Sequence, residues 1–277
     1  MQAMTETAEL FAARMRVGAT ITVLTGAGIS AESGIPTFRG KEGYWTVGSR
    51  VYQPEEMATA AMFLRRPEEV WAWYLYRRTV CRRAKPNPGH FALVELEHLL
   101  GPRFTLVTQN VDGLHLRAGS SQERTYQIHG NLDFFRCARE CHTGIHPLPE
   151  ALPEHQRGEA LSEAERMALC CPRCGGPARP HVLWFDESYD EPRYRFESTL
   201  AAADATDLLL VVGTSGATTL PNRVVANVLG RGGEVIVVDL EETVFSRAAQ
   251  RSGRCWFLNR PSSETLPTLI AGIRTGR

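Results

Sequence analysis

Short runs of apolar residues without polar alternation recur along this chain, and they limit its possible folds more than any other feature. The runs lie at Thr20–Leu24, Phe104–Val107, Asp207–Val212, Glu234–Val238 and, more weakly, Thr125–Ile128. Continuous apolar character is typical of strands that are covered on both faces. Helical spacing of apolar residues separates the runs, at His90–Leu100, Tyr194–Ala203, Arg223–Leu229 and Leu266–Ile273. This alternation predicts an α/β fold with a Rossmann-like, doubly wound parallel sheet.

Four of the cysteines occur in two closely spaced pairs. Cys137 and Cys141 form a C-x3-C pair, and Cys171 and Cys174 form a C-x2-C pair. Each spacing places two thiolates on one tight turn, and two such turns complete the tetrahedral shell of a structural zinc ion. Four protein ligands leave no open position for chemistry. Unrelated buried cysteines and disulfides are the alternatives, and Cys170 is an alternative ligand with a poorer spacing than Cys171.

Two stretches interrupt the alternation and are expected to pack together as a smaller lobe. Residues 44–81 are rich in Trp and Arg, have helical spacing and contain no expected strand. Residues 136–180 hold five of the seven cysteines, and their polar middle, Glu150–Arg166, is expected to be a loop or a short exposed helix. The predicted limits are 1–40, 82–131 and 181–277 for the sheet domain, 41–81 for the helical insertion and 132–180 for the zinc-binding insertion.

A glycine-rich turn follows the first predicted strand. The pattern Gly26-x-Gly28-x-x-Ala31 could place a pyrophosphate at a helix N-terminus, although a tight strand-to-helix turn without a ligand fits it equally well. The Lys-Ser/Thr of a phosphate-binding P-loop is absent, which disfavours a nucleoside triphosphatase. No acidic residue ends a second strand about 20 residues later, so an ordinary dehydrogenase is also disfavoured.

Polar side chains follow two of the other predicted strands. Gln109, Asn110 and Asp112 come after Phe104–Val107, and His129 comes directly after Thr125–Ile128. Because ligands bind outside the carboxyl ends of parallel strands, these residues are expected to share one site. A lone histidine in such a position is more often structural than catalytic, but the polar neighbours favour a catalytic role here.

Several segments together resemble the sirtuin signature, in the order and spacing of that family and over nearly the whole chain. They are Gly26–Gly40, Thr108–Asp112, His129–Asn131, the two cysteine pairs, Arg179–Phe185 and Gly213–Ser215. Sirtuins remove acyl groups from protein lysines by transferring ADP-ribose from NAD to the acyl oxygen. The resemblance implies an NAD-dependent protein-lysine deacylase that acts on succinyl or malonyl groups, on acetyl groups, or on both. It would yield nicotinamide, deacylated lysine and O-acyl-ADP-ribose, with NAD as co-substrate and a structural Zn²⁺.

The resemblance also assigns roles to individual residues. It implies that His129 is the general base, taking a proton from a ribose hydroxyl, and that Asn110 and Asp112 share in catalysis beside the nicotinamide ribose. An imidazole suits this role because its unperturbed pKa of about 6.5 leaves it largely neutral at pH 7. The implied cofactor-binding residues are Gly26, Ala27, Gly28, Ile35, Phe38, Arg39, Gln109, Asn110, Asp112, Gly213, Thr214, Ser215 and Asp239.

A Tyr-x-x-Arg pattern bears on the acyl group. Tyr74 and Arg77 share one face of a helix, and they match the signature of the sirtuin class that removes succinyl, malonyl and glutaryl groups. A guanidinium beside a phenol suits a terminal carboxylate, and Ala58 matches the small residue that leaves room for a longer acyl chain. A helix that packs an aromatic ring and pairs an arginine at the surface is the alternative. The implied substrate-binding residues are Ala58, Tyr74, Arg77 and, receiving the peptide as an added strand, Val182, Leu183, Trp184 and Phe185.

Some positions depart from the family pattern and keep other functions open. Asp186 replaces the glycine that usually follows Phe185, which adds a charge beside the expected peptide site. Asp239 replaces the usual asparagine near the adenosine ribose, and residues 260–264 lack the usual glycine-containing adenine contact. Asp186 could support a mono-ADP-ribosyltransferase or an NAD hydrolase on the same fold. A non-catalytic NAD-sensing module is a further alternative, and it would predict loss of catalytic side chains that are present here.

Composition bears on partners and location. The 31 basic and 31 acidic residues give a formal charge of zero, so neither nucleic acid nor a membrane surface is an expected partner. No run approaches 18 consecutive apolar residues, and Glu6 and Glu9 interrupt the first segment, so neither a spanning helix nor a targeting peptide is expected. Paired cysteines suit a reducing compartment. The expected location is the cytoplasm, the expected partners are acyl-lysine proteins or peptides, and no oligomeric state is indicated.

Overall fold

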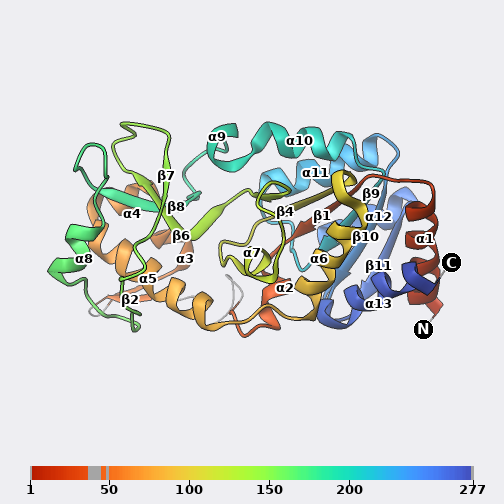
Figure 1. Ribbon diagram of the computed structural model, residues 1–277, viewed down its shortest axis with the longest axis horizontal. Coiled ribbons are helices and arrows are strands. Elements are labelled where there is room, and N and C mark those ends of the chain that lie inside the picture. The colour runs from red at the N-terminus through yellow and green to blue at the C-terminus, as the bar shows by residue number, and fades with distance from the viewer. Residues whose placement is uncertain (1, 37–44, 48–49, 276–277) are drawn as a thin grey trace.

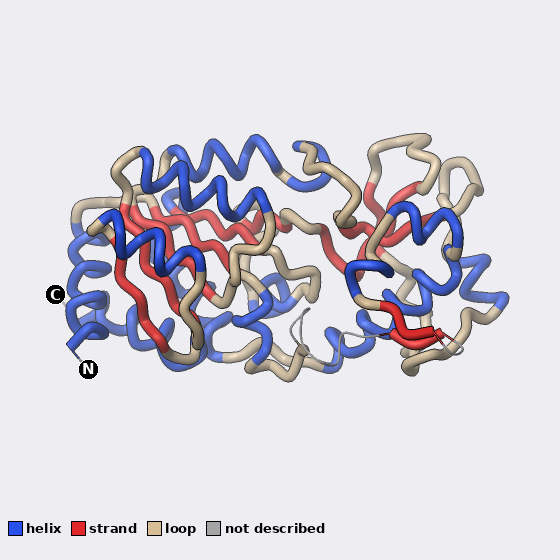
Figure 2. The backbone as a smooth tube through the Cα atoms, turned by 180° about the vertical axis from the view of Figure 1, so that it is seen from behind, coloured by secondary structure: helices blue, strands red, loops and turns tan. Residues whose placement is uncertain are grey.

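A six-stranded parallel sheet forms the centre of the larger part of the molecule (Figure 1, Figure 2). The structure is a computed structural model that describes residues 2–36, 45–47 and 50–275. In spatial order the strands are β11 (Cys255–Asn259), β10 (Glu234–Asp239), β9 (Leu208–Val212), β1 (Ile21–Thr25), β4 (Phe104–Thr108) and β5 (Thr125–Gln127). All neighbouring strands pair in parallel. The predicted α/β sheet is confirmed, and each predicted apolar run overlaps one of these strands.

Helices cover both faces of this sheet. One face packs against α1 (Gln2–Arg16), α6 (Pro88–Leu100) and α13 (Ser262–Thr275). The other face packs against α10 (Phe196–Asp204), α11 (Thr219–Gly230) and α12 (Val244–Ser252). Because successive residues of a strand point to opposite faces, Val23 of β1 enters the first core and Leu24 enters the second. None of the described helices is long and apolar enough to cross a membrane.

The chain enters the sheet at its middle. β1 lies between β9 and β4, so the chain first builds β4 and β5 on one side and later returns to the other side as β9. In open parallel sheets, ligands bind at the point where the chain changes from one side of the sheet to the other. They lie outside the carboxyl ends of the strands. The segments that follow β1, β4, β5 and β9 therefore form the expected site.

A smaller lobe lies at the end of the molecule opposite to both termini (Figure 1). It holds the antiparallel strands β7 (Ile145–Pro147), β6 (Gly130–Cys137) and β8 (Ala178–Val182) and the helices α3 (Pro54–Met57), α4 (Ala60–Arg65), α5 (Pro67–Arg83) and α8 (Glu163–Ala168). Its core joins Met57 and Trp73 to Phe135 and Leu152. The two insertions therefore pack together as predicted, while the residue limits of the domains remain a prediction.

Three details differ from the sequence-based expectations. Residues 44–81 were expected to contain no strand, but β2 (Trp45–Val47) and β3 (Arg50–Tyr52) form an antiparallel pair separate from the larger sheet. Their β-branched and aromatic residues favour strands, and the helical spacing starts only at Pro54. The polar insertion is not only an exposed loop, because the buried pair His155 and Glu165 approach to 2.6 Å. The edge strand β11 has no counterpart among the predicted runs.

Candidate functional site

The glycine-rich turn lies at the carboxyl end of β1 and leads into α2 (Ala27–Ala31), as predicted. It packs tightly against the segment after β9. Gly28 N donates to Gly213 O at 2.8 Å, and a Cβ at Gly28 would lie 2.5 Å from Gly213 Cα. A Cβ at Gly26 would lie 2.6 Å from Thr214 Cβ. Glycine is therefore needed for two backbone segments to cross here, in addition to any contact with a phosphate.

The amide side chains after β4 bind to the same turn. Asn110 is buried, and its Nδ2 donates to Gly26 O at 3.0 Å and to Ser30 Oγ at 3.1 Å. Gln109 Nε2 donates to Thr214 Oγ1 at 2.8 Å. These bonds join the loops that follow β1, β4 and β9, so the structure brings the predicted residues of all three loops together.

Asp112 is buried on the same loop. Its Oδ1 accepts a hydrogen bond from Leu114 N at 2.8 Å, at the start of α7 (Leu114–Ala118). Burial raises the pKa of the Asp112 carboxyl, and hydrogen bonds from Leu114 and Ser30 oppose the rise. Beside the same turn, Ala27 is half-buried and Ile35 is buried in the core of the smaller lobe.

His129 lies between β5 and β6, where the chain crosses from the sheet to the smaller lobe. Its Nδ1 lies 3.1 Å from Gln109 O, and its Nε2 lies 2.8 Å from Tyr189 Oη. Loss of solvation lowers the pKa of this imidazole to about 4, and the hydrogen bond to the Gln109 carbonyl opposes the change only partly. At neutral pH the ring is therefore uncharged, as a general base requires.

Two residues of this network were missed by the sequence analysis. Tyr189 contacts His129, and Thr218 Oγ1 donates to Gln109 Oε1 at 3.1 Å. Tyr189 belongs to no motif and precedes α9 (Glu191–Tyr194) in a loop. Thr218 could have been considered from its place shortly after the Gly213–Ser215 motif, but nothing in the sequence signals Tyr189.

Asp239, Ser215, Phe38 and Arg39 are the remaining predicted cofactor-binding residues. Asp239 ends β10 and is half-buried, and its Oδ1 accepts from Glu241 N at 3.2 Å. Burial raises the pKa of the Asp239 carboxyl, against hydrogen bonds from nearby backbone N–H groups. Ser215 is exposed directly after Thr214. Phe38 and Arg39 lie outside the described residues.

Residues 260–264, which lack the usual glycine-containing adenine contact, bind to Glu32 through Ser262 and Ser263. Glu32, just after α2, accepts a hydrogen bond from Ser262 Oγ at 2.8 Å and another from Ser263 N at 3.1 Å. Ser263 Oγ also donates to Glu32. These contacts fix the N-terminus of α13 beside the glycine-rich turn, since carboxylates stabilise helix N-termini.

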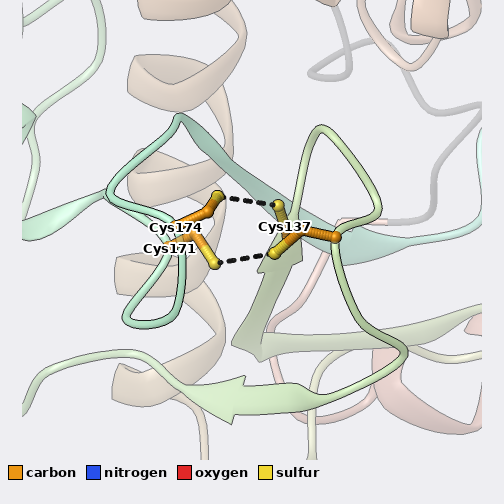
Figure 3. A group of neighbouring side chains, drawn as sticks. Cys137, Cys171 and Cys174 are labelled. Carbon is orange, nitrogen blue, oxygen red and sulfur yellow. Dashed lines mark hydrogen bonds between the residues drawn. The ribbon is translucent and has the colours of Figure 1, made fainter.

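The four paired cysteines form one cluster in the smaller lobe, which we call the cysteine quartet (Cys137, Cys141, Cys171 and Cys174). Their sulfur atoms all lie within 4.8 Å of one another, and Cys137 to Cys174 and Cys141 to Cys171 are 3.7 Å apart. Figure 3 shows Cys171 and Cys174 on one loop facing Cys137 on the other. Tetrahedral zinc with Zn–S bonds of about 2.3 Å requires sulfur atoms roughly 3.8 Å apart. The quartet therefore fits zinc, whereas Cys170 Sγ donates to Arg166 O instead.

Two of the predicted acyl-binding residues, Tyr74 and Ala58, contact the segment Val182–Phe185. Tyr74 is buried, and its hydroxyl accepts a hydrogen bond from Trp184 Nε1 at 2.9 Å. Burial raises the pKa of this phenol, and the Trp184 bond and the positive charge of Arg77 oppose the rise. Arg77 is half-buried with its Cζ 5.3 Å from the centre of the Trp73 ring. Tyr74 therefore packs in the core of the smaller lobe, which the structural alternative also expects, and the acyl-binding role of the pair remains a prediction.

The segment Val182–Phe185 is held on both sides by the rest of the chain. Val182 pairs with Gly130, and Leu183 N donates to His129 O at 3.0 Å. Phe185 N donates to Ala58 O at 3.0 Å, next to the predicted acyl-binding residue Ala58, which is buried. A peptide added as a strand would therefore have to pair mainly with carbonyl groups of this segment.

Asp186 is explained by a helix terminus. Its Oδ1 accepts from Ala60 N at 2.7 Å, and its Oδ2 accepts from Ala61 N at 3.1 Å. These N–H groups belong to the first turn of α4 and have no acceptor within the helix. In the same turn Thr59 Oγ1 accepts from Met62 N. The carboxylate therefore fastens the segment after Phe185 to the junction that carries Ala58.

Replacing Asp186 with glycine is expected to lower the free energy of unfolding by about 1 kcal/mol, the usual effect of losing a helix cap. The KM for an acylated peptide should rise because the junction at Ala58 loosens, while the KM for NAD stays constant. Urea denaturation and steady-state kinetics measure the two effects. Ser188→Ala, an exposed change in the same loop, is the control. An Asp186→Gly enzyme with unchanged stability and peptide KM would contradict this role.

The groups at the carboxyl edge of the sheet fit NAD. Amide and hydroxyl groups come from the loops after β1, β4 and β9, a carboxylate ends β10, and a neutral imidazole follows β5. Dinucleotides bind at this edge in doubly wound sheets. The chain therefore belongs to the class of NAD-binding proteins that join a Rossmann-like domain to a four-cysteine zinc module.

Comparisons with known proteins identify the family. A family model described as the Sir2 family matches residues 26–219. A protein named NAD-dependent protein deacylase from Leptospira interrogans serovar Lai is 40% identical over 254 residues, covering 91% of this chain and 92% of the relative. One of the same name from Thermus thermophilus is 46% identical over 206 residues, covering 73% and 72%. A solved complex of a Sir2 homolog with NAD has a TM-score of 0.78 at 32% identity, covering 97% of this chain and 94% of that one. The chain belongs to the Sir2 family, the sirtuins.

Proposed function

We propose that this chain is an NAD-dependent protein-lysine deacylase that releases nicotinamide, deacylated lysine and O-acyl-ADP-ribose. The observation that carries the proposal is the uncharged imidazole of His129 beside Gln109 at the carboxyl edge of the sheet. A base at this edge must be unprotonated at the working pH, and the pKa of about 4 meets this condition. The similar proteins named NAD-dependent protein deacylase support the same activity.

The roles of the residues follow from this activity. When bound, NAD would supply the ADP-ribosyl group that is transferred to the acyl oxygen, with nicotinamide as the leaving group. His129 accepts a proton from a ribose hydroxyl, and Asn110 and Asp112 act beside it as buried hydrogen-bonding partners, Asn110 held by Gly26 and Ser30. The proposed cofactor-binding residues are Gly26, Ala27, Gly28, Ile35, Phe38, Arg39, Gln109, Asn110, Asp112, Gly213, Thr214, Ser215 and Asp239.

We further propose that acyl groups ending in a carboxylate, succinyl and malonyl, are preferred. The Tyr74 hydroxyl accepts from Trp184, so its own hydrogen remains available to a carboxylate. Arg77 supplies the positive charge, and buried Ala58 leaves space for a longer chain. The substrates are acyl-lysine proteins or peptides bound along Val182–Phe185. The thiolates of the cysteine quartet need a reducing compartment, which supports a cytoplasmic location.

Replacing Arg77 with methionine tests the acyl preference. Activity on succinyl-lysine peptide should fall at least about 10-fold because the charge-assisted hydrogen bond to the carboxylate is lost. Activity on acetyl-lysine peptide should change little, since acetyl carries no charge. The measurement is kcat/KM on matched acetyl-, succinyl- and malonyl-lysine peptides with saturating NAD.

Arg83→Met is the matched control, because Arg83 lies on the same helix in an exposed ion pair with Glu154. It should leave all three activities unchanged. Equal losses on acetyl and succinyl substrates in Arg77→Met would contradict the carboxylate role.

The same peptides separate the alternative functions. ADP-ribose formed without deacylated peptide would indicate an NAD hydrolase or a mono-ADP-ribosyltransferase, and no NAD turnover would indicate a sensing module. Asp186, the feature that favoured the first alternative, caps α4 instead. We therefore expect deacylated peptide and O-acyl-ADP-ribose in equal amounts.

A further inference from the structure

The loop before α9 brings a phenol to the general base. The Tyr189 hydroxyl lies 2.8 Å from His129 Nε2, and the two ring centres are 5.9 Å apart. The Tyr189 ring is half-buried and stacks on Phe196 with a centre distance of 6.1 Å. Tyr189 is therefore held from one side by α10 and reaches the site from the segment that follows the predicted peptide-binding residues.

The partners of His129 fix the direction of this hydrogen bond. Nδ1 faces the carbonyl oxygen of Gln109, which can only accept, so Nδ1 carries the hydrogen of the neutral ring. Nε2 then has a lone pair and no hydrogen. The Tyr189 hydroxyl must be the donor, and it occupies the lone pair that a general base would use.

The environment of Tyr189 keeps it a donor. Burial raises the pKa of its phenol to about 12, so the hydroxyl stays protonated at neutral pH. Thr218, whose hydroxyl lies near that of Tyr189, donates its one hydrogen to Gln109 Oε1 at 3.1 Å. The hydroxyl thus lies where the loops after β4, β5 and β9 converge, at the edge proposed for the cofactor.

Resting on the proposed function, we propose that the Tyr189 hydroxyl donates a hydrogen bond to Nε2 of His129 in the cofactor-free enzyme. A ribose hydroxyl displaces it when NAD binds. A single lone pair accepts one good hydrogen bond, so phenol and ribose compete for it. Tyr189 lies in the loop between β8 and α9, outside any helix or strand, and Ser188 beside it is exposed. NAD binding must break the Tyr189–His129 hydrogen bond, and the free energy that this requires lowers the affinity for NAD.

Tyr189→Phe tests the displacement because it keeps the ring and removes only the hydroxyl. Calorimetric titration of the zinc-loaded protein should show ADP-ribose binding roughly 2- to 10-fold tighter than in the wild type, the gain expected for one net hydrogen bond. The KM for NAD should fall by a similar factor, with kcat retained within about twofold. A residue that only supported the fold would weaken binding when altered, so the direction of the change is decisive.

Tyr126→Phe is the control, since Tyr126 is a half-buried tyrosine on β5 that packs near Arg195. It should leave ADP-ribose affinity unchanged. Unchanged or weaker binding in Tyr189→Phe, with the wild-type melting temperature, would overturn the proposal. So would a large fall in kcat at constant KM, because Tyr189 would then act with the cofactor bound.

A second measurement is independent of the proposed function. The ¹⁵N resonance of His129 Nε2 in the cofactor-free protein reports whether its lone pair accepts a hydrogen bond. We expect a clear shift between the wild type and Tyr189→Phe, and no shift overturns the contact itself. If this shift is seen but the wild type binds no ADP-ribose, the proposed function fails and the displacement by NAD fails with it.

Discussion

Replacing Cys171 with alanine is expected to release zinc and unfold the smaller lobe. The four sulfurs of the cysteine quartet are already spaced for a tetrahedral ion, and structural zinc contributes on the order of 10 kcal/mol or more to folding. The lobe also holds the Val182 pairing and the Leu183 bond to His129, so deacylase activity should be lost with the metal. Zinc content by atomic absorption and thermal unfolding measure the two effects.

Cys170→Ala is the matched control because Cys170 is adjacent in sequence and lies outside the quartet. It should retain one zinc per chain and the wild-type melting temperature. A Cys171→Ala protein that keeps its zinc while Cys170→Ala loses it would assign the ligand to Cys170. Full stability after complete chelation would contradict a structural metal.

Replacing His129 with alanine is expected to lower kcat by roughly 100- to 10,000-fold, the usual contribution of a general base. The uncharged imidazole lies at the junction of the β4 and β5 loops, and Nε2 is its acceptor atom. Single-turnover deacylation of an acylated peptide measures the loss.

His98→Ala, on an exposed position of α6, should have no effect on turnover. ADP-ribose binding by His129→Ala should persist, which separates loss of chemistry from loss of fold. Retention of more than about a tenth of wild-type turnover would exclude His129 as the base.

The sheet could be predicted because its signals are local. Buried parallel strands such as Leu208–Val212 carry uninterrupted apolar residues, and the glycines at 26 and 28 mark the turn after β1. β11 escaped prediction because it is an edge strand whose residues Cys255, Trp256 and Phe257 remain half-buried. The antiparallel strands β2 and β3 are short and lie within a stretch of mostly helical spacing.

The site could be predicted only where a motif marks it. Gln109, Asn110, Asp112 and His129 follow strands and meet as expected. Tyr189 meets His129 across 60 positions of sequence, through a loop with no regular spacing, so no local pattern could indicate the contact. The sequence suggested that Asp186 adds a charge at the substrate site. Its true partner, the N-terminus of α4, lies about 125 positions away in sequence, so the residues next to Asp186 could not indicate the contact.

Residues 182–189 connect nearly every part of the site. Within them Leu183 binds the backbone of His129, Trp184 binds Tyr74, Asp186 caps α4 and Tyr189 binds the imidazole. On the functions proposed above, peptide binding, acyl preference and access to the base therefore all depend on this one stretch. We therefore expect that substitutions in this stretch alter all three properties together, and that exchanging the whole stretch between relatives transfers the substrate preference.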